Sequence, residues 1–487
     1  MLGLGGLTPH GKKVCLGDKN IMRKKRNHEV WAGIVTIIMI LPVVTVCVNA
    51  DEPFKPIIPD SPRFIHNGGK AIVFGAWNCV LQWQNVWKRD GITGGEGNRI
   101  ATDGSNAYVA GVDCYGDGVI LKYSTTGDLL WDVTPESLSQ PEDLAEYVGY
   151  HPLSGKGCEP ENFTQEQHEI SSRIMNMSSL WDVCYDNIRH EIISAGQAQV
   201  LGIPVLLIIK RDAETGQKIW DKVYSFIGTG YEGKPIAGGV SVDENGDIFV
   251  AGGIYTSVDV MGVEWVTSII GLNLNLGPNG IRHWVTIDDR LSEGGWVVYS
   301  GNGFISERLF TAGYKFIPTT WRYSFLASEL NRNTGDTFNN IERNNDMFCV
   351  HMITDENAIY AVGGFGMKEM GALLKLTPSL ELVYEKTIRN DFFQDIAVKG
   401  DMLALCGMVV QFNYTISLVN KSSGEKITRM KVGQVSYFCG PYPNTGSGLV
   451  VDNDGNFLLS GGSGAIDTLK CTISYITGIP GSEMEHN

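Results

Sequence analysis

One pattern of apolar and polar positions returns along the chain: an alternating segment, a turn rich in Asp, Asn and Gly, and a second segment that ends in Gly. Alternation with a period of two predicts strands, and Gly-bearing turns predict hairpins. The clearest copies are IATDGSNAYVAG (100–111), VSVDENGDIFVAGG (240–253), MITDENAIYAVGG (352–364), IAVKGDMLALCG (396–407) and LVVDNDGNFLLSGG (449–462). Two weaker copies are VCYDNIRHEIISAG (183–196) and VVYSGNGFISERLFTAG (297–313). The sequence therefore predicts seven similar hairpins.

A second pair of strands follows each hairpin, as in VILKYSTTGDLLWDV and LLIIKRDAETGQKIWDKV. Four antiparallel strands per repeat, named A to D, make one blade of a β-propeller. The repeat glycines lie 44 to 61 residues apart, except for a first gap of 85 residues. Most gaps therefore approach the roughly 40 to 50 residues of a propeller blade. We predict an all-β, seven-bladed propeller over residues 79–478, with an insertion at 135–180.

The last repeat lacks a D strand, because only LKCTISYI follows its hairpin before the repeat pattern ends. A segment with D-strand character occurs near the other end of the propeller, in VLQWQNVWKRD (Val80 to Asp90). We predict that this N-terminal strand pairs alongside Leu469 to Ile476, completes the last blade and removes an exposed sheet edge. Residues 51–78 are then expected to be a linker and residues 479–487 a tail.

The first fifty residues resemble an export signal. Lys24-Lys25-Arg26 precedes an apolar run at 31–48, and Val48-Asn49-Ala50 offers a small residue to a signal peptidase. A translation start at Met22 would give a signal peptide of ordinary length. We therefore interpret the residues before Met22 as the result of a start codon assigned too far upstream. An uncleaved N-terminal anchor is the alternative, because the apolar run approaches the length that spans a bilayer. Either reading places the rest of the chain at the cell surface or outside the cell.

Charge excludes two classes of partner. Beyond residue 50, 32 Lys and Arg oppose 52 Asp and Glu, which gives a net charge of −20. Such a body repels nucleic acid and anionic lipid, so we expect neither nucleic-acid binding nor direct membrane binding after signal cleavage.

Eight cysteines follow residue 50, and an exported chain can form disulfides. The insertion carries Cys158 and should leave the first blade on the same face as the loop that carries Cys114. We therefore predict a Cys114–Cys158 disulfide, with Cys439 as the competing partner. Three other cysteines lie inside strand patterns, where the residue is usually small, apolar and buried: Cys184, Cys349 and Cys406.

Glycosylation sequons occur at Asn162, Asn176, Asn413 and Asn420. They are candidate glycan sites in an exported protein, although Ser and Thr are common enough for such motifs to arise by chance.

The repeats resemble those of secreted seven-bladed β-propeller proteins (SBBP-like repeats), with their pattern V-D-x-x-G-N-x-Y-V-A-G followed by L-x-K-x-x-x-x-G-x-x-x-W. The segment DAETGQKIW, Asp212 to Trp220, is also similar to the Trp-docking motif of quinoprotein propellers. The resemblance covers about residues 80–478 and implies the architecture rather than an activity. A quinone cofactor is not expected, since that family has eight docking motifs and we find only one good copy in seven repeats.

Local motifs do not indicate a catalytic or metal site. Asp452-Asn453-Asp454-Gly455-Asn456 and Asp243-Glu244-Asn245-Gly246-Asp247 resemble calcium loops but lack a carboxylate at the twelfth position, so we interpret them as A–B turns. Histidines show no metal-ligand spacing, and no HExxH, GxSxG or P-loop motif occurs in the sequence. We expect no metal and no cofactor, and catalytic residues stay unknown, although several blades could assemble a site together.

The B–C loops and D–A connections of a propeller share one face, and the A–B and C–D turns share the other. Aromatic residues with a few charges on the first face suit a glycan or peptide ligand. The alternative is that Trp265 and Trp321 pack between blades. The candidate ligand residues are Tyr115, Asp117, Tyr255, Trp265, Trp321, Arg322, Lys368 and Asp467.

The sequence thus favours a non-catalytic extracellular propeller that binds a glycan, a peptide or a neighbouring surface protein. A propeller hydrolase or lyase with a site assembled from several blades is the alternative.

Overall fold

The computed structural model describes residues 64–67, 70–73, 76–91, 95–113, 115–135, 175–200, 203–226, 233–260, 263–290, 295–365, 368–389, 392–409, 413–434, 448–462 and 466–476. All of them belong to one compact unit, Cys47–Gly440 with Asn444–Asn487. The expected export signal and most of the expected insertion lie outside the described residues. Within those residues, no helix is long and apolar enough to cross a membrane.

Seven four-stranded antiparallel sheets make up this unit, which confirms the predicted seven-bladed, all-β propeller. Blades one and two are β4 (Glu96–Thr102), β5 (Ala107–Val112), β6 (Gly118–Tyr123), β7 (Leu129–Val133), and β8 (Met175–Asp186), β9 (Glu191–Val200), β10 (Ile203–Asp212), β11 (Lys218–Tyr224). Blades three and four are β12 (Lys234–Val242), β13 (Ile248–Val260), β14 (Val263–Leu276), β15 (Arg282–Asp288), and β16 (Trp296–Ile305), β17 (Arg308–Ile317), β18 (Arg322–Leu330), β19 (Thr337–Arg343). Blades five and six are β20 (Met347–Thr354), β21 (Ile359–Phe365), β22 (Lys368–Leu376), β23 (Leu382–Arg389), and β24 (Phe392–Lys399), β25 (Met402–Val409), β26 (Asn413–Asn420), β27 (Lys426–Gln434). Blade seven is β28 (Gly448–Val451), β29 (Phe457–Gly461), β30 (Ile466–Ile476) and β3 (Ala76–Trp87).

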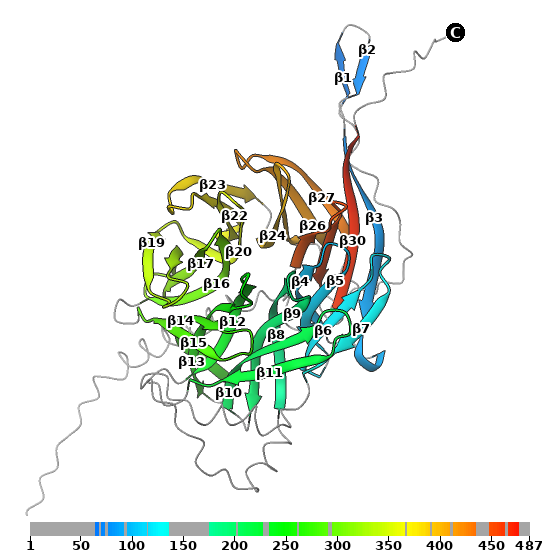
Figure 1. The fold of residues 1–487 in the computed structure, drawn as a ribbon. Helices are drawn as coiled ribbons and strands as arrows, with labels where there is room; N and C mark the ends of the chain where they lie inside the picture. The colour runs from blue at the N-terminus through cyan, green and yellow to red at the C-terminus, as the bar shows by residue number, and fades with distance from the viewer. Residues whose placement is uncertain are drawn as a thin grey trace, which may run out of the picture. The chain divides into compact units, whose positions relative to one another are not determined.

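The blades follow one another around a ring (Figure 1). The A strand of each blade contacts the A strand of the next, from β4 through β8, β12, β16, β20 and β24 to β28, which in turn contacts β4. One blade cannot bury both faces of its sheet, so the stability of each blade depends on its neighbours. The hydrophobic clusters reflect this, because one cluster joins Phe310 of blade four to Met352 and Leu374 of blade five.

The N-terminal strand closes the ring as predicted. β3 pairs with β30 in antiparallel register, with Val80 opposite Thr472 and Trp87 opposite Ile466. The last blade is therefore built from both ends of the propeller sequence. The strand order of its sheet is β28-β29-β30-β3.

Two features fall inside ranges for which we expected no strands. The A strand of blade two begins at Met175, within the range expected for the insertion. A two-stranded hairpin, β1 (Phe64–Asn67) with β2 (Lys70–Val73), lies within the expected linker. A short 3-10 helix, Arg89–Gly91, follows β3.

The repeat glycine has a common steric cause. In six blades it lies opposite the residue that precedes a bulge in the A strand, as Gly196 does opposite Leu180 and Gly313 opposite Tyr299. A methyl group on Gly313 would overlap the carbonyl oxygen of Val298, and one on Gly196 would overlap that of Ser179. The glycine that revealed the repeat therefore allows the A and B strands to stay paired across the bulge.

Candidate functional site

The antiparallel order of each blade gives the propeller two different faces. The turn face carries the A–B and C–D turns. The loop face carries the B–C loops and the D–A connections between blades, together with the ends of the A strands where the bulges occur.

On the turn face, one hydrogen bond repeats from blade to blade. A side chain on the D strand donates to a carbonyl oxygen in the C–D turn of the next blade, and in blades one to five this side chain is the third residue of the D strand. The bonds run from Trp83 Nε1 to Thr125 (3.0 Å), Trp131 Nε1 to Glu214 (3.1 Å), Trp220 Nε1 to Pro278 (3.1 Å) and Trp284 Nε1 to Arg332 (2.8 Å). Asn339 and Tyr384 make the equivalent bonds to Ser379 (3.2 Å) and Lys421 (3.2 Å).

This repetition corrects the sequence analysis, which found one good copy of the docking motif. Four tryptophans dock in the same way, because the interaction needs only an indole on a D strand and a turn carbonyl within reach. A turn glycine lies beneath several of these rings, as Gly216 does beneath Trp131 and Gly335 beneath Trp284. Both glycines have a positive backbone φ, 72° and 78°, which residues other than glycine rarely adopt.

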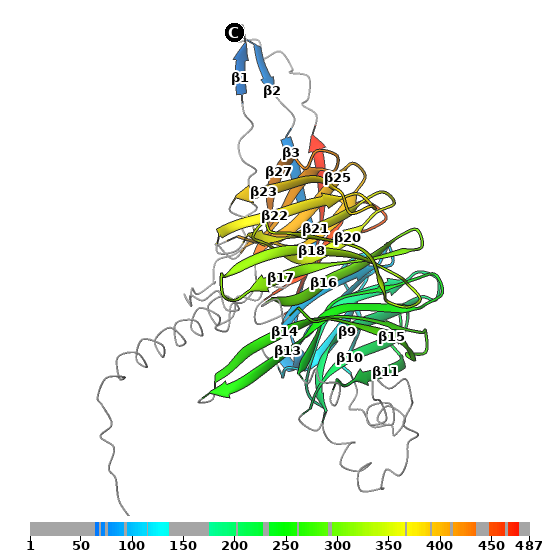
Figure 2. The same ribbon diagram turned by 90° about the vertical axis from the view of Figure 1, so that its left-hand side faces the viewer.

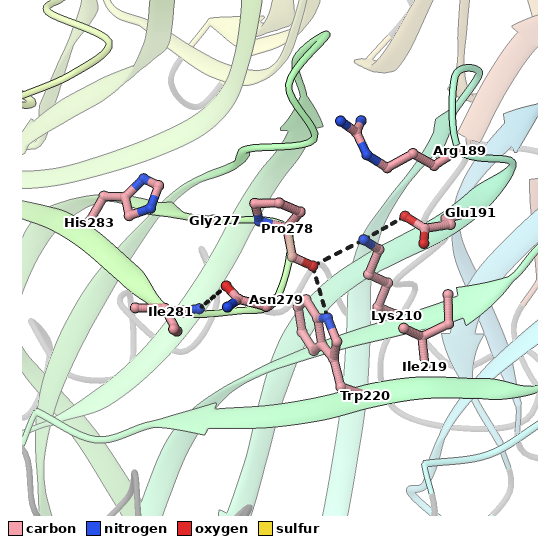
Figure 3. Close-up of a pocket in the computed structure, with 10 residues that line it drawn as sticks. All are labelled: Arg189, Glu191, Lys210, Ile219, Trp220, Gly277, Pro278, Asn279, Ile281 and His283. Atoms are coloured by element: carbon pink, nitrogen blue, oxygen red, sulfur yellow. Dashed lines mark hydrogen bonds and ion pairs between the residues drawn. The ribbon is translucent and has the colours of Figure 1, made fainter.

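A groove of about 580 Å³ lies on the turn face between blades two and three (Figure 3). Trp220 and Pro278 form its centre, and Ile219 and Ile281 lie along its sides. The Lys210 Nζ inside it donates to the Pro278 carbonyl oxygen (3.1 Å) and pairs with the Glu191 carboxylate (2.5 Å). Its central polar groups thus serve the junction between the blades, and we interpret the groove as part of the docking seam.

The two calcium-like loops are A–B turns, as interpreted from the sequence. In each, the first Asp accepts backbone hydrogen bonds within its own turn: Asp452 from Asn456 (2.7 Å) and Asp243 from Asp247 (2.9 Å). Among the described residues, no group of His, Cys, Asp and Glu could hold a metal ion.

On the loop face, the structure brings two predicted ligand residues together. Tyr115 and Asp117 lie in the B–C loop of blade one, next to Arg89, which follows the closing strand β3. The Arg89 guanidinium lies 5.4 Å from the centre of the Tyr115 ring and 3.1 Å from the Asp117 carboxylate. It also pairs with the buried Asp113 (2.5 Å), and the hydrogen bond that Arg89 donates to the Asp113 carboxylate raises the pKa of Arg89. Sequence analysis missed Arg89 and Asp113.

Tyr255 and Trp265 lie on the B–C hairpin of blade three, which is longer than the others. Its strands have 13 and 14 residues, and Figure 2 shows them projecting beyond their neighbours. Lys234 Nζ lies 5.7 Å from the centre of the Tyr255 ring. Trp265 pairs with Val258 near the end of the hairpin, and its side chain lies outside what the structure describes.

Trp321 belongs to a set of aromatic rings on the loop face of blades four to six, here called the aromatic patch. Its ring is 5.7 Å from that of Phe316, which is 5.5 Å from Trp296 and 4.8 Å from Tyr323. The Phe348 ring of blade five lies 5.2 Å from Tyr323, and Phe392 of blade six lies 5.3 Å from Phe348. The patch consists of Trp296, Tyr314, Phe316, Trp321, Tyr323, Phe348 and Phe392. All except Phe316 are half-buried, so these rings contact each other and also face solvent.

Charged groups border the aromatic patch. Arg322 is exposed beside Trp321. At the connection from blade three to blade four, Arg290 pairs with Asp288 (2.9 Å) and Glu342 (2.9 Å). The Tyr299 hydroxyl donates to Asp288 (2.6 Å), and burial raises the pKa of Tyr299.

The remaining candidates are spread over other places. Asp467 was expected on the ligand face, but it is 1% exposed and accepts a hydrogen bond from the Tyr414 hydroxyl (3.4 Å), so it cannot meet a ligand. Lys368 begins β22, and its side chain lies outside the described part of the chain.

Four ionisable side chains project from the inner strands at the residue that follows the bulge, and we call them the axial quartet: Arg99, Asp182, His351 and Asp395. The same position is Gly239 in blade three and Gly301 in blade four. Nothing in the linear pattern marked these residues, because the bulge that aligns them is visible only in the sheet.

The axial quartet ties separate blades together. Asp182 accepts from the Val240 backbone N–H (2.7 Å) and Asp395 from that of Leu449 (2.7 Å), each in the next blade. The Arg99 guanidinium of blade one donates to the Val350 carbonyl oxygen of blade five (3.4 Å).

The axial quartet is also electrostatically unusual. His351 Nε2 lies 3.4 Å from the Asp395 carboxylate, yet burial lowers the pKa of His351 despite that neighbour. Burial likewise raises the pKa of Asp182. His351 Nδ1 and Arg99 Nε are buried and have no hydrogen-bond partner among the described residues.

The proposed covalent modifications have different outcomes. Cys114, Cys158, Cys439 and Asn162 lie outside the described residues, so the predicted disulfide stays a prediction. None of the five cysteines that the structure describes is in a disulfide. Cys349 and Cys406 are buried, and Cys184 is half-buried, as expected for small apolar residues in strands.

Two of the remaining sequons lie in strands: Asn176 in β8 and Asn413 in β26, both with side chains outside the described set. The third sequon residue, Asn420, ends β26 and begins the C–D turn of blade six. Its Oδ1 accepts hydrogen bonds from the backbone N–H groups of Ser422 (3.0 Å) and Ser423 (2.9 Å).

No protein-family model matches the chain, and no curated protein matches it. Among solved structures, the chain is similar to the β-propeller domain of Cps50 (Swd1) from Myceliophteria thermophila, with 8% identity, a TM-score of 0.45, and coverage of 80% of this chain and 99% of that chain. It is also similar to BamB from Moraxella catarrhalis, with 14% identity, a TM-score of 0.36, and coverage of 78% and 85%. Similarities of this degree carry no argument about function, so the assignment of the chain as a seven-bladed β-propeller rests on its own strand pairing.

Proposed function

We propose that this protein is a non-catalytic binding propeller whose loop face holds a glycan, a peptide or a neighbouring surface protein. The observation that supports this best is the aromatic patch. Half-buried rings supply large, rigid contact area at a low cost in conformational entropy, and they bind flat apolar surfaces such as a sugar face or a peptide side chain.

The polar groups around the patch favour recognition over chemistry. Arg290 forms ion pairs with Asp288 and Glu342, and these pairs keep the three side chains oriented. Arg322 is an exposed charge beside Trp321. A few oriented polar groups beside aromatic contact area are typical of ligand sites. The projecting hairpin of blade three lies on the same face and could extend the contact to a larger partner.

We also propose that the protein acts outside the cytosol, which rests on the basic and apolar pattern of residues 24–50. Mass spectrometry of the intact mature protein from its source cells tests this. A mature chain that begins after Ala50 supports cleavage. A cytosolic protein that keeps the full N-terminus contradicts export.

The binding proposal is tested with purified protein on arrays of neutral oligosaccharides and of peptides, followed by calorimetric titration of the best probe. Trp321→Ala should weaken binding about fivefold or more, because truncating a tryptophan at the centre of a binding site costs over about 1 kcal/mol.

Phe338→Ala is the matched control. Phe338 is 67% exposed on β19 of the same blade but lies at the turn-face end of that strand. It should leave affinity unchanged. Equal affinity for wild type and Trp321→Ala, with both proteins folded, would reject the aromatic patch as the site.

A hydrolase or lyase with its site assembled from several blades is the second candidate, and the axial quartet favours it. Asp395 contacts His351 Nε2 and leaves Nδ1 without a partner, while the lowered pKa keeps the imidazole neutral and able to accept a proton. If the protein is a hydrolase or lyase with His351 as its base, an activity detected in a screen of oligosaccharide substrates should be lost in the His351→Gln variant. Activity that survives this substitution would exclude His351 as the base.

A further inference from the structure

Two cysteines lie on the seam that closes the propeller. Cys79 is on β3, the first strand of the ring, and Cys471 is on β30, the last strand. Cys79 is opposite Ile473, and Leu81 is opposite Cys471. Because side chains alternate along a strand, Cys79 and Cys471 are diagonal neighbours on the same face of this sheet.

The two thiols share one environment. Both lie in the hydrophobic cluster formed between blades six and seven, where Cys471 is fully buried and Cys79 is half-buried. The interaction between the two thiols lowers the pKa of Cys79 and raises that of Cys471. Cys79 is thus both the more accessible thiol and the one that ionises more readily.

We propose that Cys79 and Cys471 form a disulfide that locks the propeller ring when the protein meets a disulfide oxidant. The Cys79 thiolate attacks one sulfur of the small-molecule disulfide and releases one thiolate. Cys471 then loses its proton, attacks the Cys79 sulfur and releases the second thiolate. Two protein thiols are oxidised and one small disulfide is reduced to two thiols, so atoms and electrons balance.

The position of this bond gives it a mechanical role. β3 holds the last blade by strand pairing and side-chain packing. A Cys79–Cys471 bond would turn this closure into a covalent one and enclose nearly the whole propeller in a single loop. The entropic stabilisation by a disulfide grows with the length of the loop that it closes, so this pair is well placed to stabilise the fold.

The test uses the purified full-length chain, reduced and then incubated under native conditions with oxidised glutathione. Free thiols are alkylated, and the digested protein is mapped by mass spectrometry. We expect a linked peptide pair containing Cys79 and Cys471, and a melting temperature higher by about 5 °C than that of the reduced protein.

Cys79→Ala and Cys471→Ala should each abolish the difference in melting temperature between the oxidised and reduced forms. Cys406→Ala is the matched control, since Cys406 lies in the same hydrophobic cluster but on β25 of blade six. It should retain the difference. Because the wild-type peptide map needs no variant to fold, alkylation of both cysteines after oxidation, or a linkage of Cys79 to another cysteine, would overturn the proposal. The test is independent of the proposed export, which only determines whether the protein meets such an oxidant in the cell.

Discussion

The turn face and the loop face are built from the same seven repeats, but only the turn face has a side-chain hydrogen bond that recurs between neighbouring blades. On the turn face, a D-strand side chain docks on a carbonyl of the next blade, with Trp in four blades and Asn or Tyr in two others. On the loop face, each blade differs: an Arg89 cluster at blade one, a projecting hairpin at blade three, and an aromatic patch over blades four to six.

The difference teaches how this propeller separates stability from specificity. A contact that most seams share recurs in most repeats, so it produces a periodic pattern in the sequence. A ligand is not seven-fold symmetric, so its site breaks the repeat. We therefore expect substitutions on the turn face to change stability, and substitutions on the outer loop face to change binding.

The largest effect is expected where the A strand bulges. Gly313→Ala would place a methyl group against the Val298 carbonyl oxygen and the Tyr299 backbone, and neither can move without breaking the strand pairing. We expect a loss of about 4 kcal/mol or more in the free energy of unfolding, measured by denaturant titration.

Gly400→Ala serves as its control. No atom lies within 4 Å of the methyl group that it adds, and only its positive φ of 56° opposes the change. The expected loss is about 1 kcal/mol. Equal losses at the two positions would contradict the steric explanation of the repeat glycine.

The second prediction compares a tryptophan on each face. Trp131→Ala removes an indole that donates to Glu214 and packs against the core between blades one and two, so we expect a loss of about 3 kcal/mol in unfolding free energy. Trp321→Ala should cost less stability but weaken ligand binding. The contrast between the faces fails if Trp131→Ala impairs binding in a protein that is still folded, or if Trp321→Ala is the more destabilising change.

The third prediction concerns the pH dependence of stability at the axial quartet. Burial lowers the pKa of His351, so below the usual value of 6.5 the unfolded chain takes up a proton that the folded chain does not. Stability should therefore fall as pH drops below about 6.5, by at most about 1.4 kcal/mol per pH unit for this one group. Asp182 acts in the opposite direction, because its raised pKa makes it contribute more stability at acidic pH.

His351→Gln isolates the histidine contribution. Unfolding titrations of wild type and variant between pH 5 and 7.5 should show a steeper loss toward acid in the wild type. Parallel curves would mean that His351 is protonated equally in the folded and unfolded states.

The smallest effect is expected at the junction between blades four and five, where Asn339 replaces tryptophan. There, Arg308 donates to the Glu329 carboxylate (2.7 Å) and to the Pro378 carbonyl oxygen (2.8 Å) across the seam. Because the arginine is 44% exposed, Arg308→Ala should cost no more than about 1 kcal/mol, and the loss should shrink as salt is added. A loss as large as that of Trp131→Ala would show that this seam relies on the ion pair.

Much of the fold could be predicted because each blade carries its own local signal. The alternating segments, the Asp and Gly turns and the repeat glycine occur within about fifty residues of one another, so they are visible without knowledge of the tertiary structure. Closure by β3 was predictable for a related reason, since the last repeat lacked one strand and a segment of the same character began the propeller.

The candidate sites were less predictable. The sequence identified Trp321 and Arg322, but not the other rings of the aromatic patch, because Trp296, Phe348 and Phe392 begin different A strands and meet only when the blades pack. The axial quartet was missed because the bulge that aligns Arg99 with His351 depends on strand pairing.

The sequence by itself determined the number of blades, their strand order and the strand that closes the ring, because these depend on patterns with a period of two inside each repeat. Tertiary structure alone decided which side chains share a site. It grouped Arg89 with Tyr115, gathered the aromatic patch from three blades and placed Cys79 beside Cys471. The physical reason is that a ring of blades brings the corresponding ends of distant strands together, and no local pattern records which residues meet there.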